Sequence, residues 1–362
     1  AEKKKVGVNI IHVFIMSNEL GNAIASTVID TFNGLSIKSG KPVVRSNGVE
    51  EWTVLASVVA ITNNNIMPIT LATGVKTLPD KVRSYSNGLM VHDMHAEILA
   101  LRLFNYYLLE KDCPLVGHSV LKHDVKLALF ISEPPCGDAS MSYISSNLTN
   151  NEPWTPQKKQ LNRGRNNFGE LGVVRTKPGR SDSLISYSKS CSDKLCLKQL
   201  VGICNATTST LFKDSIFLDY LVTKNLPAKD FHRCFRTRFD LPSVVHPLQL
   251  LTYDCDGYEF VKSEEKSPSP LSLLHIVPLN VTQVLNNGVK NGSFIKNKPP
   301  KKGGESIICN QNFINRLKQI REVDYPDYIS FKHSNTARQA LKMAGRKKLK
   351  DWVSSTADNF VL

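Results

Sequence analysis

The order of helical and strand-like segments is what most limits the folds open to this chain. Apolar residues at helical spacing come first, and two runs rich in Val, Ile and Thr follow on either side of Asn63-Asn64-Asn65. The helical segments are residues 17–32, 93–109, those after Pro134-Pro135, 312–320 and 334–352, and the strand segments are 52–61, 66–72 and 125–132. Because an asparagine turn suits a hairpin, the order is helix, hairpin, helix, strand, helix. It predicts an α/β fold in which helices cover a sheet.

Two polar segments interrupt this pattern. Residues 150–183 are a basic stretch with Gly and Pro, and residues 286–306 combine Gly, Asn and Pro with several lysines. We expect a basic loop at the first and a surface insertion at the second. The length of 362 residues suits two domains or one large domain with an elaboration. We expect residues 1–15 to be a leader or an added segment outside the fold, because a cap and a helical pattern begin only after them.

The charge of the chain indicates a polyanionic partner. Lys and Arg number 46 against 32 Asp and Glu, which gives a formal net charge of +14. Nucleic acid is the leading candidate, because cations that meet phosphates release counterions, and a basic but unspecialised surface is the alternative. The apolar stretches are far shorter than the roughly 20 residues that span a bilayer. We therefore expect no membrane partner, and no obligatory protein partner is evident.

The eight cysteines form no Cys-x-x-Cys pair and no short regular framework. In a chain of this length, that pattern is typical of reduced thiols in an intracellular protein, with a few on metal. Nucleus and cytoplasm both stay open, because the basic runs 296–302 and 346–350 suit import signals or ordinary surface charge equally well.

Three short motifs carry the candidate chemistry. His95-Ala-Glu97 stands at the start of one expected helix, and Cys136 follows two prolines at the start of the next. Helix N-termini favour a thiolate, and a thiolate with a neutral imidazole suits zinc. His-x-Glu followed by Pro-Cys-x-x-Cys is the signature of zinc nucleobase deaminases, but Ala replaces its second cysteine here, and Cys191 is the nearest substitute. A lone His-x-Glu is usually a surface helix turn, and a lone cysteine after proline is usually a buried core residue. The occurrence of all three motifs in this order favours a zinc site instead.

With His-Ala-Glu, Ser-Glu-Pro-Pro-Cys-Gly-Asp and Ser-Cys-Ser-Asp-Lys, the sequence resembles the eukaryotic adenosine deaminases that act on RNA and tRNA, in which an insertion separates the two cysteines. The resemblance runs from Ser17 to the C-terminus through phrases such as Arg175-Thr-Lys-Pro-Gly and Trp352-Val353. It implies a single adenosine deaminase domain over residues 16–362, built on a cytidine-deaminase-like mixed sheet with a C-terminal helical elaboration.

The resemblance also implies hydrolytic deamination of adenosine to inosine. His95, Cys136 and Cys191 would hold zinc, whose water ionises near neutral pH, and the hydroxide would attack C6 of adenine. Glu97 would shuttle the proton to the ring and the departing amine. No separate pattern for double-stranded RNA binding is present, which favours the members that act on tRNA, at the adenosine just 3′ of the anticodon (position thirty-seven) of alanine tRNA.

Basic side chains are the expected contacts to RNA phosphates. They are Lys76, Lys158, Lys159, Arg163, Arg165 and Arg180, with Arg233, Arg236 and Arg238 as further candidates. Each is otherwise an ordinary solvated charge. The alternative functions are deamination of duplex or messenger RNA and a non-catalytic, zinc-stabilised RNA-binding role, which an unligated Glu97 disfavours.

The lysines near the C-terminus allow two interpretations, a solvated basic face or a partly buried cluster that needs an anion. The resemblance favours the second, because it implies inositol hexakisphosphate buried beneath the active site. The implied contacts are Arg102, Lys194, Lys290, Tyr328, Lys332, Lys342 and Trp352, with Asp93 and Lys177 as a polar relay to the zinc site. Leu101 and Leu197 stand where the family has further basic residues, so we expect fewer cations around the anion.

Overall fold

The fold is built on one mixed sheet. The computed structural model describes residues 2–63, 65–147, 162–164, 169–177, 183–239 and 246–362, with side chains from residue 18 onward. Within these residues the sheet has nine strands, in the spatial order β11 (Gln249–Leu251), β10 (Tyr220–Val222), β9 (Val125–Ile131), β2 (Leu55–Thr62), β4 (Thr70–Thr73), β13 (Leu271–Ile276), β14 (Val281–Asn286) and β15 (Val289–Lys290), and β3 (Asn65–Pro68) also pairs with β2. Strands β9, β10 and β11 are parallel, and the other pairs are antiparallel. The predicted α/β class with a mixed sheet is confirmed.

Helices and short strand pairs surround the sheet. The helices are α1 (Glu2–Asn33), α2 (Arg83–Ser86), α3 (Ala96–Tyr107), α4 (Met141–Asn147), α5 (Cys191–Val201), α6 (Ala228–His232), α7 (Asn310–Ile320), α8 (Tyr328–Ser334) and α9 (Thr336–Lys348). The small pairs are β1 (Glu51–Trp52) with β12 (Ser267–Pro268), β5 (Val75–Thr77) with β6 (Asp93–His95), and β7 (Val116–Gly117) with β8 (Val120–Leu121). Turns of 3-10 helix lie at Asp80–Val82, Asp138–Ser140, Thr208–Leu211 and Val277–Leu279, and a π-helical turn lies at Arg233–Thr237.

The predicted hairpin is present, but its second strand is divided. The pairing of Thr62 with Asn65 closes the asparagine turn between β2 and β3. Pro68 has no N–H to donate, and the chain bulges directly after it, so that three residues of the second strand face two residues of β2 before β4 pairs again. A single apolar run in the sequence therefore becomes two strands.

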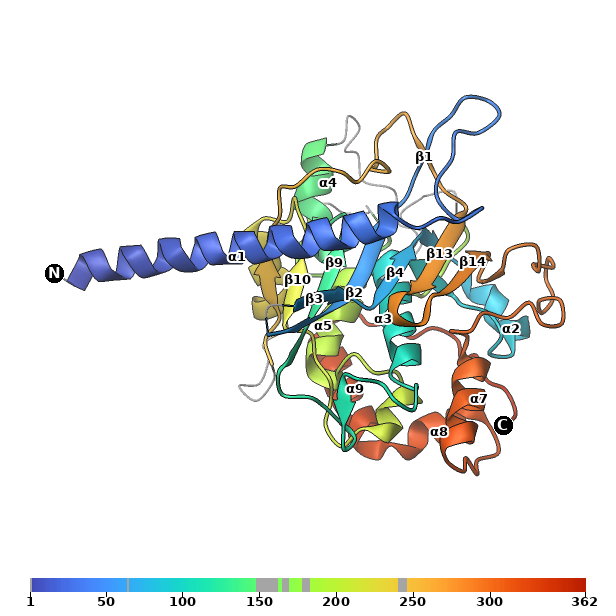
Figure 1. Cartoon of the computed structure of the whole chain (residues 1–362). Helices are drawn as coiled ribbons and strands as arrows, with labels where there is room; N and C mark the ends of the chain where they lie inside the picture. The colour runs from blue at the N-terminus through green and yellow to red at the C-terminus, as the bar shows by residue number, and fades with distance from the viewer. Residues whose placement is uncertain (1, 64, 148–161, 165–168, 178–182, 240–245) are drawn as a thin grey trace.

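Helices cover both faces of the sheet, and α1 crosses one of them (Figure 1). Along β2, Leu55 and Val59 belong to the same apolar cluster as Phe32 of α1. The intervening Val58 belongs to the cluster on the opposite face, which contains Leu99 of α3. Because side chains alternate along a strand, one apolar sequence run serves two cores.

Two helices begin at residues other than those expected. Helix α1 begins at Glu2 instead of Ser17, so residues 2–15 continue the helix that the sequence pattern placed after them. Helix α3 begins at Ala96 instead of Asp93, because Asp93–His95 pair with β5 and leave His95 extended as the N-cap. Pairing with a distant strand cannot be recognised from a row of apolar residues at helical spacing.

The C-terminal helices α7, α8 and α9 gather at one end of the molecule (Figure 1). On α9, a Cβ added to Gly345 would lie 2.5 Å from Leu197 Cδ1 of α5, so the two helices approach closely at this glycine. Helix α9 is shorter than the predicted 334–352, and Trp352 lies beyond its end. Helix α8 was not predicted from the sequence, because its single apolar row is too short to recognise.

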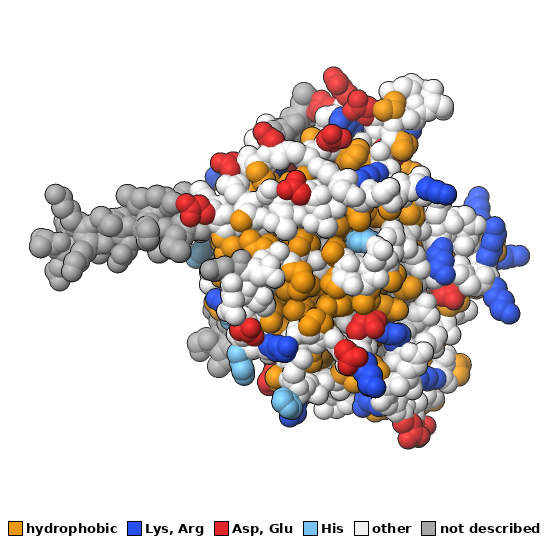
Figure 2. Space-filling view, viewed as in Figure 1, with side chains coloured by type: hydrophobic (Ala, Val, Ile, Leu, Met, Phe, Trp, Pro, Cys, Tyr) orange, Lys and Arg blue, Asp and Glu red, His pale blue; other side chains and the backbone are white. Residues whose placement is uncertain are grey.

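The insertion expected at 286–306 is β15 followed by an exposed loop. Lys296, Lys298, Lys301 and Lys302 are exposed there. Figure 2 shows basic side chains gathered at the corresponding edge of the molecule. The basic loop expected at 150–183 lies largely outside the described residues. Among the helices that the structure describes, none combines the length and apolar character needed to cross a bilayer.

Phe32→Ala should lower the free energy of unfolding by about 3–5 kcal/mol, because it empties a fully buried aromatic site between α1 and the sheet. Urea unfolding followed by circular dichroism measures this cost. Glu19→Ala, at an exposed position of the same helix, is the control and should stay within about 0.5 kcal/mol of the unmodified protein. Equal costs for the two variants would mean that α1 does not pack on the sheet.

Candidate active site

Two helix N-termini and one loop carry the candidate site. His95 is the N-cap of α3, and Glu97 lies in the first turn of that helix. Cys136 lies in the loop after β9, and Cys191 is the first residue of α5. Ser190 caps α5 and accepts a hydrogen bond from the Asp193 N–H, which fixes where the helix begins.

The four side chains converge on one point. One ligand atom each from His95, Glu97, Cys136 and Cys191 lies within 4.8 Å of the others. Cys136 Sγ is 3.6 Å from His95 Nδ1, and it accepts a hydrogen bond from the Cys191 N–H at 3.4 Å. Glu97 and Cys191 are buried, whereas His95 and Cys136 are partly exposed. Two sulfurs and an imidazole nitrogen are the donors that zinc prefers, so these residues fit the predicted metal.

Gly137 allows the two cysteine-bearing segments to touch. Its φ of 106° is unfavourable for residues with a side chain, and an added Cβ would lie 2.2 Å from Ser190 Oγ. Ser192 donates its backbone N–H to the Cys136 carbonyl at 3.0 Å and its hydroxyl to the Pro135 carbonyl at 3.0 Å. The N-terminus of α5 is therefore docked directly on the loop after β9.

The two thiols differ in acidity because they share a hydrogen bond. The hydrogen bond from Cys191, together with the nearby Lys177 and His95, lowers the pKa of Cys136 well below its usual value, although burial opposes this. Burial and the contact with Cys136 raise the pKa of Cys191. A thiolate is thus favoured at Cys136 before any metal binds, and a bound cation would favour ionisation of both thiols.

A buried charge cluster adjoins Cys191. Lys177 donates to Cys191 Sγ at 3.0 Å and to both carboxylate oxygens of Asp93 at 2.9 and 2.8 Å. Lys194 also contacts Asp93 and donates to Ser188 Oγ at 2.8 Å. Burial would raise the pKa of Asp93, but the charges of Lys177 and Lys194 outweigh it and hold that pKa far below its usual value. The structure thus brings together Asp93 and Lys177, the pair that the resemblance implied as a relay.

A cavity of about 440 Å³ lies on the other side of this cluster, between α3, the C-terminal helices and the chain's last segment. Six of the implied anion contacts line it: Arg102, Lys194, Tyr328, Lys332, Lys342 and Trp352. Sequence reasoning missed Arg83, Lys189 and Arg346, which also line it. Among the described lining residues, seven Lys and Arg side chains face only two carboxylates, those of Asp93 and Asp358.

The cavity lysines lose basicity because they are buried together. Burial, followed by the charges of Lys332 and Arg346, lowers the pKa of Lys342 to about 7. Burial lowers the pKa of Lys189 to about 8. The C-terminal segment that closes the cavity is held by Asp358, which accepts hydrogen bonds from Ser86 Oγ at 3.0 Å and from the Gly88 N–H at 2.9 Å. Ser86 and Asp358 are 272 residues apart in the sequence, so no local sequence signal could have linked them.

Several predicted residues lie elsewhere. Lys290 is not among the residues that line the cavity; it lies on β15, and its ammonium donates to the Gly303 carbonyl, so the geometry does not support its expected role as an anion contact. Arg163 is buried and donates to the Ser183 carbonyl, which does not leave it at the surface for a phosphate. Lys76 lies on β5, opposite Met94 of the strand that ends in His95. Lys158, Lys159, Arg165 and Arg180 lie outside the described residues.

The three arginines near residue 235 are also not free surface charges. Arg233 pairs with Asp138, and Arg238 pairs with Asp193. Arg236 donates to the Leu248 carbonyl. Each of these guanidinium groups already has acceptors within the protein, so their role as phosphate contacts stays a prediction.

The mixed sheet and the His/Glu/Cys/Cys cluster are typical of zinc nucleobase deaminases. A family model described as the adenosine-deaminase (editase) domain matches residues 70–354. Proteins named tRNA-specific adenosine deaminase 1 are similar over most of their length: that of Schizosaccharomyces pombe is 37% identical over 95% of this chain and 97% of its own, and that of Saccharomyces cerevisiae is 34% identical over 97% of each. The Drosophila melanogaster protein of the same name is 26% identical over 82% of each chain. This chain belongs to the adenosine-deaminase (editase) domain family, which confirms the family inferred from the motifs.

Asp93→Asn should lower the free energy of unfolding at pH 7 by about 3–5 kcal/mol, because it leaves two buried lysines without their counter-charge. The pKa of Asp93 is depressed in the folded protein, so its contribution is present above a pH of about 4 and is lost as the pH falls below that value. Urea unfolding at several pH values measures the difference between variant and unmodified protein, which should shrink in acid. Asp324→Asn, at an exposed position, is the control. A difference that is constant with pH would contradict the charge pairing.

Proposed function

We propose that the protein is a zinc-dependent hydrolase that converts adenosine to inosine in tRNA. The observation that carries this proposal is the convergence of His95, Cys136 and Cys191 beside Glu97. Three ligands of this kind leave one coordination position open, as catalytic zinc requires, and a closed structural site would have no need of the carboxylate. The names of the relatives support tRNA as the substrate, and a net charge of +14 suits a polyanion.

Zinc held by His95, Cys136 and Cys191 would acidify water and so supply a nucleophile near neutral pH. Glu97 would accept one proton from the attacking water and deliver it to N1 of adenine, and would then carry the second proton of that water from the oxygen on C6 to the amine that leaves. The burial of Glu97 limits exchange of that proton with bulk solvent. Lys177 would hold the Cys191 sulfur in place through its hydrogen bond and share its charge with Asp93. The products are inosine and ammonia.

The target that we propose is the adenosine just 3′ of the anticodon (position thirty-seven) of alanine tRNA. A base in a single-stranded loop costs least to bring into a closed site. Lys76 is a candidate contact to the RNA backbone, because β5 carries it beside the strand that ends in His95. A cation at that place can contact a phosphate that flanks the target nucleotide.

Glu97→Gln should retain zinc and lose at least about 10²-fold in turnover, because the proton shuttle is lost while the ligands remain. His95→Ala and Cys191→Ala should lose both zinc and turnover. The measurement is inosine formation in alanine tRNA transcripts, read as adenosine-to-guanosine changes on sequencing, together with the zinc content of the same preparations.

The same adenosine-containing transcript incubated without enzyme supplies the background for this assay. Full zinc content in Cys191→Ala would remove that residue from the ligand set. Equal turnover on a long RNA hairpin and on alanine tRNA would instead overturn the assignment of substrate and leave the chemistry intact.

We also propose that the cavity of Lys332 and Lys342 binds inositol hexakisphosphate. Its seven cations exceed the two carboxylates, and burial lowers the pKa of Lys189, Lys332 and Lys342, so a bound polyanion would favour their charged forms. Lys194 reaches both this cavity and Asp93, so the anion would adjoin the relay through Lys177 to Cys191. In this proposal, the cations of Arg83, Lys189 and Arg346 replace the basic residues that are missing at positions 101 and 197, where this chain has leucines.

Protein purified from cells, after removal of nucleic acid, should hold close to six phosphorus atoms per chain, measured by elemental analysis. Combined Lys332→Gln and Lys342→Gln should release most of this phosphorus and lower the melting temperature, because both positions line the cavity. Lys347→Gln, at an exposed position of α9, the helix that carries Lys342, is the control. A phosphorus content of zero in the unmodified protein would contradict the proposal.

A further inference from the structure

Each candidate cysteine ligand is followed two residues later by a fully buried aspartate. Asp138 follows Cys136, and Asp193 follows Cys191. Buried carboxylates need cations and hydrogen-bond donors, so the partners of these two fix the backbone on which the cysteines stand.

Both cations come from one short segment of the chain. Arg233 contacts the Asp138 carboxylate through Nε at 3.1 Å and donates from Nη2 to the Asp138 carbonyl at 2.8 Å. Arg238 contacts the Asp193 carboxylate through Nη1 at 2.7 Å. The Arg238 side chain is 4% exposed and that of Arg233 is 21% exposed, so water screens neither contact fully.

A π-helical turn sets the spacing of these two arginines. The Arg238 N–H donates to the Arg233 carbonyl at 3.0 Å, so the turn closes over five residues instead of four. In an α-helix, side chains five residues apart point about 140° away from each other around the axis. The wider turn brings them to neighbouring directions, which lets one segment reach both aspartates; such turns are rare and are frequent at functional sites.

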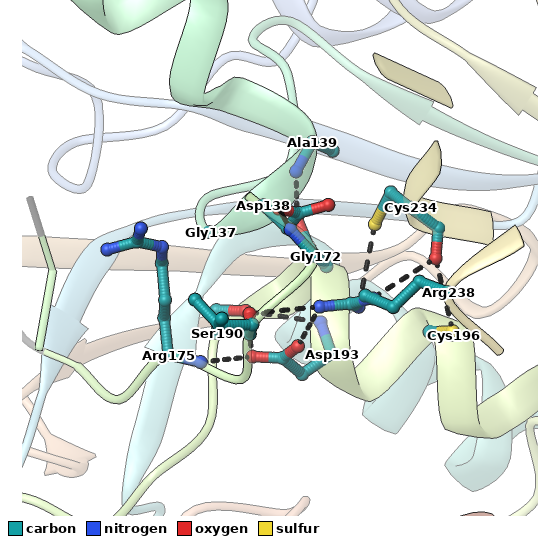
Figure 3. A network of polar contacts seen from close by, with 12 residues as sticks. Gly137, Asp138, Ala139, Gly172, Arg175, Ser190, Asp193, Cys196, Cys234 and Arg238 are labelled. Carbon is teal, nitrogen blue, oxygen red and sulfur yellow. Dashed lines mark hydrogen bonds and ion pairs between the residues drawn. The ribbon is translucent and has the colours of Figure 1, made fainter. Parts of the chain in front are cut away.

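The carboxylate oxygens of Asp138 and Asp193 that do not contact these arginines accept hydrogen bonds from a third segment of the chain, which begins at Gly172. The Gly172 N–H donates to Asp138 at 2.6 Å, and the Arg175 N–H donates to Asp193 at 2.9 Å. Figure 3 shows Arg175 and Arg238 meeting at the carboxylate of Asp193. The same segment continues to Lys177, which contacts Cys191 Sγ. Three parts of the chain are thus tied together around the two cysteines.

We propose that Arg233 and Arg238 are positioning residues that act as a clamp, holding the Cys136 and Cys191 sulfurs at the separation zinc requires before zinc binds. This inference rests on the proposed zinc site. The clamp touches neither metal nor substrate; it acts through Asp138 and Asp193. Ligands that are already placed lose less conformational freedom on binding, and partners behind the ligands typically change metal affinity by about 10–100-fold.

The test compares Arg233→Gln and Arg238→Gln with Arg236→Gln. Arg236 is the matched control, because it lies in the same turn and contacts Leu248 and Gln199 instead of either aspartate. The readouts are the rate at which a chromogenic chelator removes zinc, the thiolate-to-metal absorption band of the cobalt-substituted protein, and the melting temperature. We expect zinc release to be roughly 10-fold faster or more in the first two variants and unchanged in the control.

If Arg238→Gln does not fold, Arg233→Lys still tests the clamp, because this variant retains the positive charge and loses only the forked contact. We expect faster zinc release from it with a melting temperature close to that of Arg236→Gln. Zinc release that is no faster than in Arg236→Gln, in a protein whose unmodified form holds zinc, would overturn the clamp alone. Absence of zinc from the unmodified protein would instead overturn the proposed function.

Discussion

The structure depends on one contact, the docking of the α5 N-terminus on the loop that follows β9. Cys136 and Cys191 are 55 residues apart in the sequence, yet the backbone N–H of one donates to the sulfur of the other. Only a glycine at position 137 leaves room for Ser190 at this junction. The sheet fixes where β9 ends, and α3 brings His95 and Glu97 to the same point from the opposite side, so the site is a consequence of how three elements meet.

Buried charge extends outward from this contact in an ordered way. Lys177 links the Cys191 sulfur to Asp93, Asp93 links Lys177 to Lys194, and Lys194 reaches the cationic cavity. Along this series of contacts each charged group lies beside one of opposite sign, whereas the lining of the cavity holds more cations than carboxylates. An excess of buried positive charge is unstable without an anion, and this is the physical reason for treating the cavity and the site as one electrostatic unit.

Sequence patterns predicted the elements that are long and periodic. The helix before the hairpin from Ser17 onward, the strand β9 and the helix α7 lie where apolar spacing indicated, and the motif residues lie together as the family resemblance implied. The patterns failed where a distant partner decides the conformation. Asp93 and His95 are in a strand because β5 lies beside them, and the basic residues Arg233 and Arg238 are paired with Asp138 and Asp193, which the sequence pattern did not indicate.

The sequence alone determined which side chains are available for chemistry, because imidazole, thiol and carboxylate have fixed donor properties and their motifs are local. It also determined the family, because the similarity to known members extends over most of the chain. Only the tertiary structure decided which charges are paired, that Lys290 stands apart from the cavity while Arg83, Lys189 and Arg346 line it, and that one π-helical turn reaches both aspartates. These outcomes depend on burial and on contacts between distant residues, which are properties of the packed chain and not of any local segment.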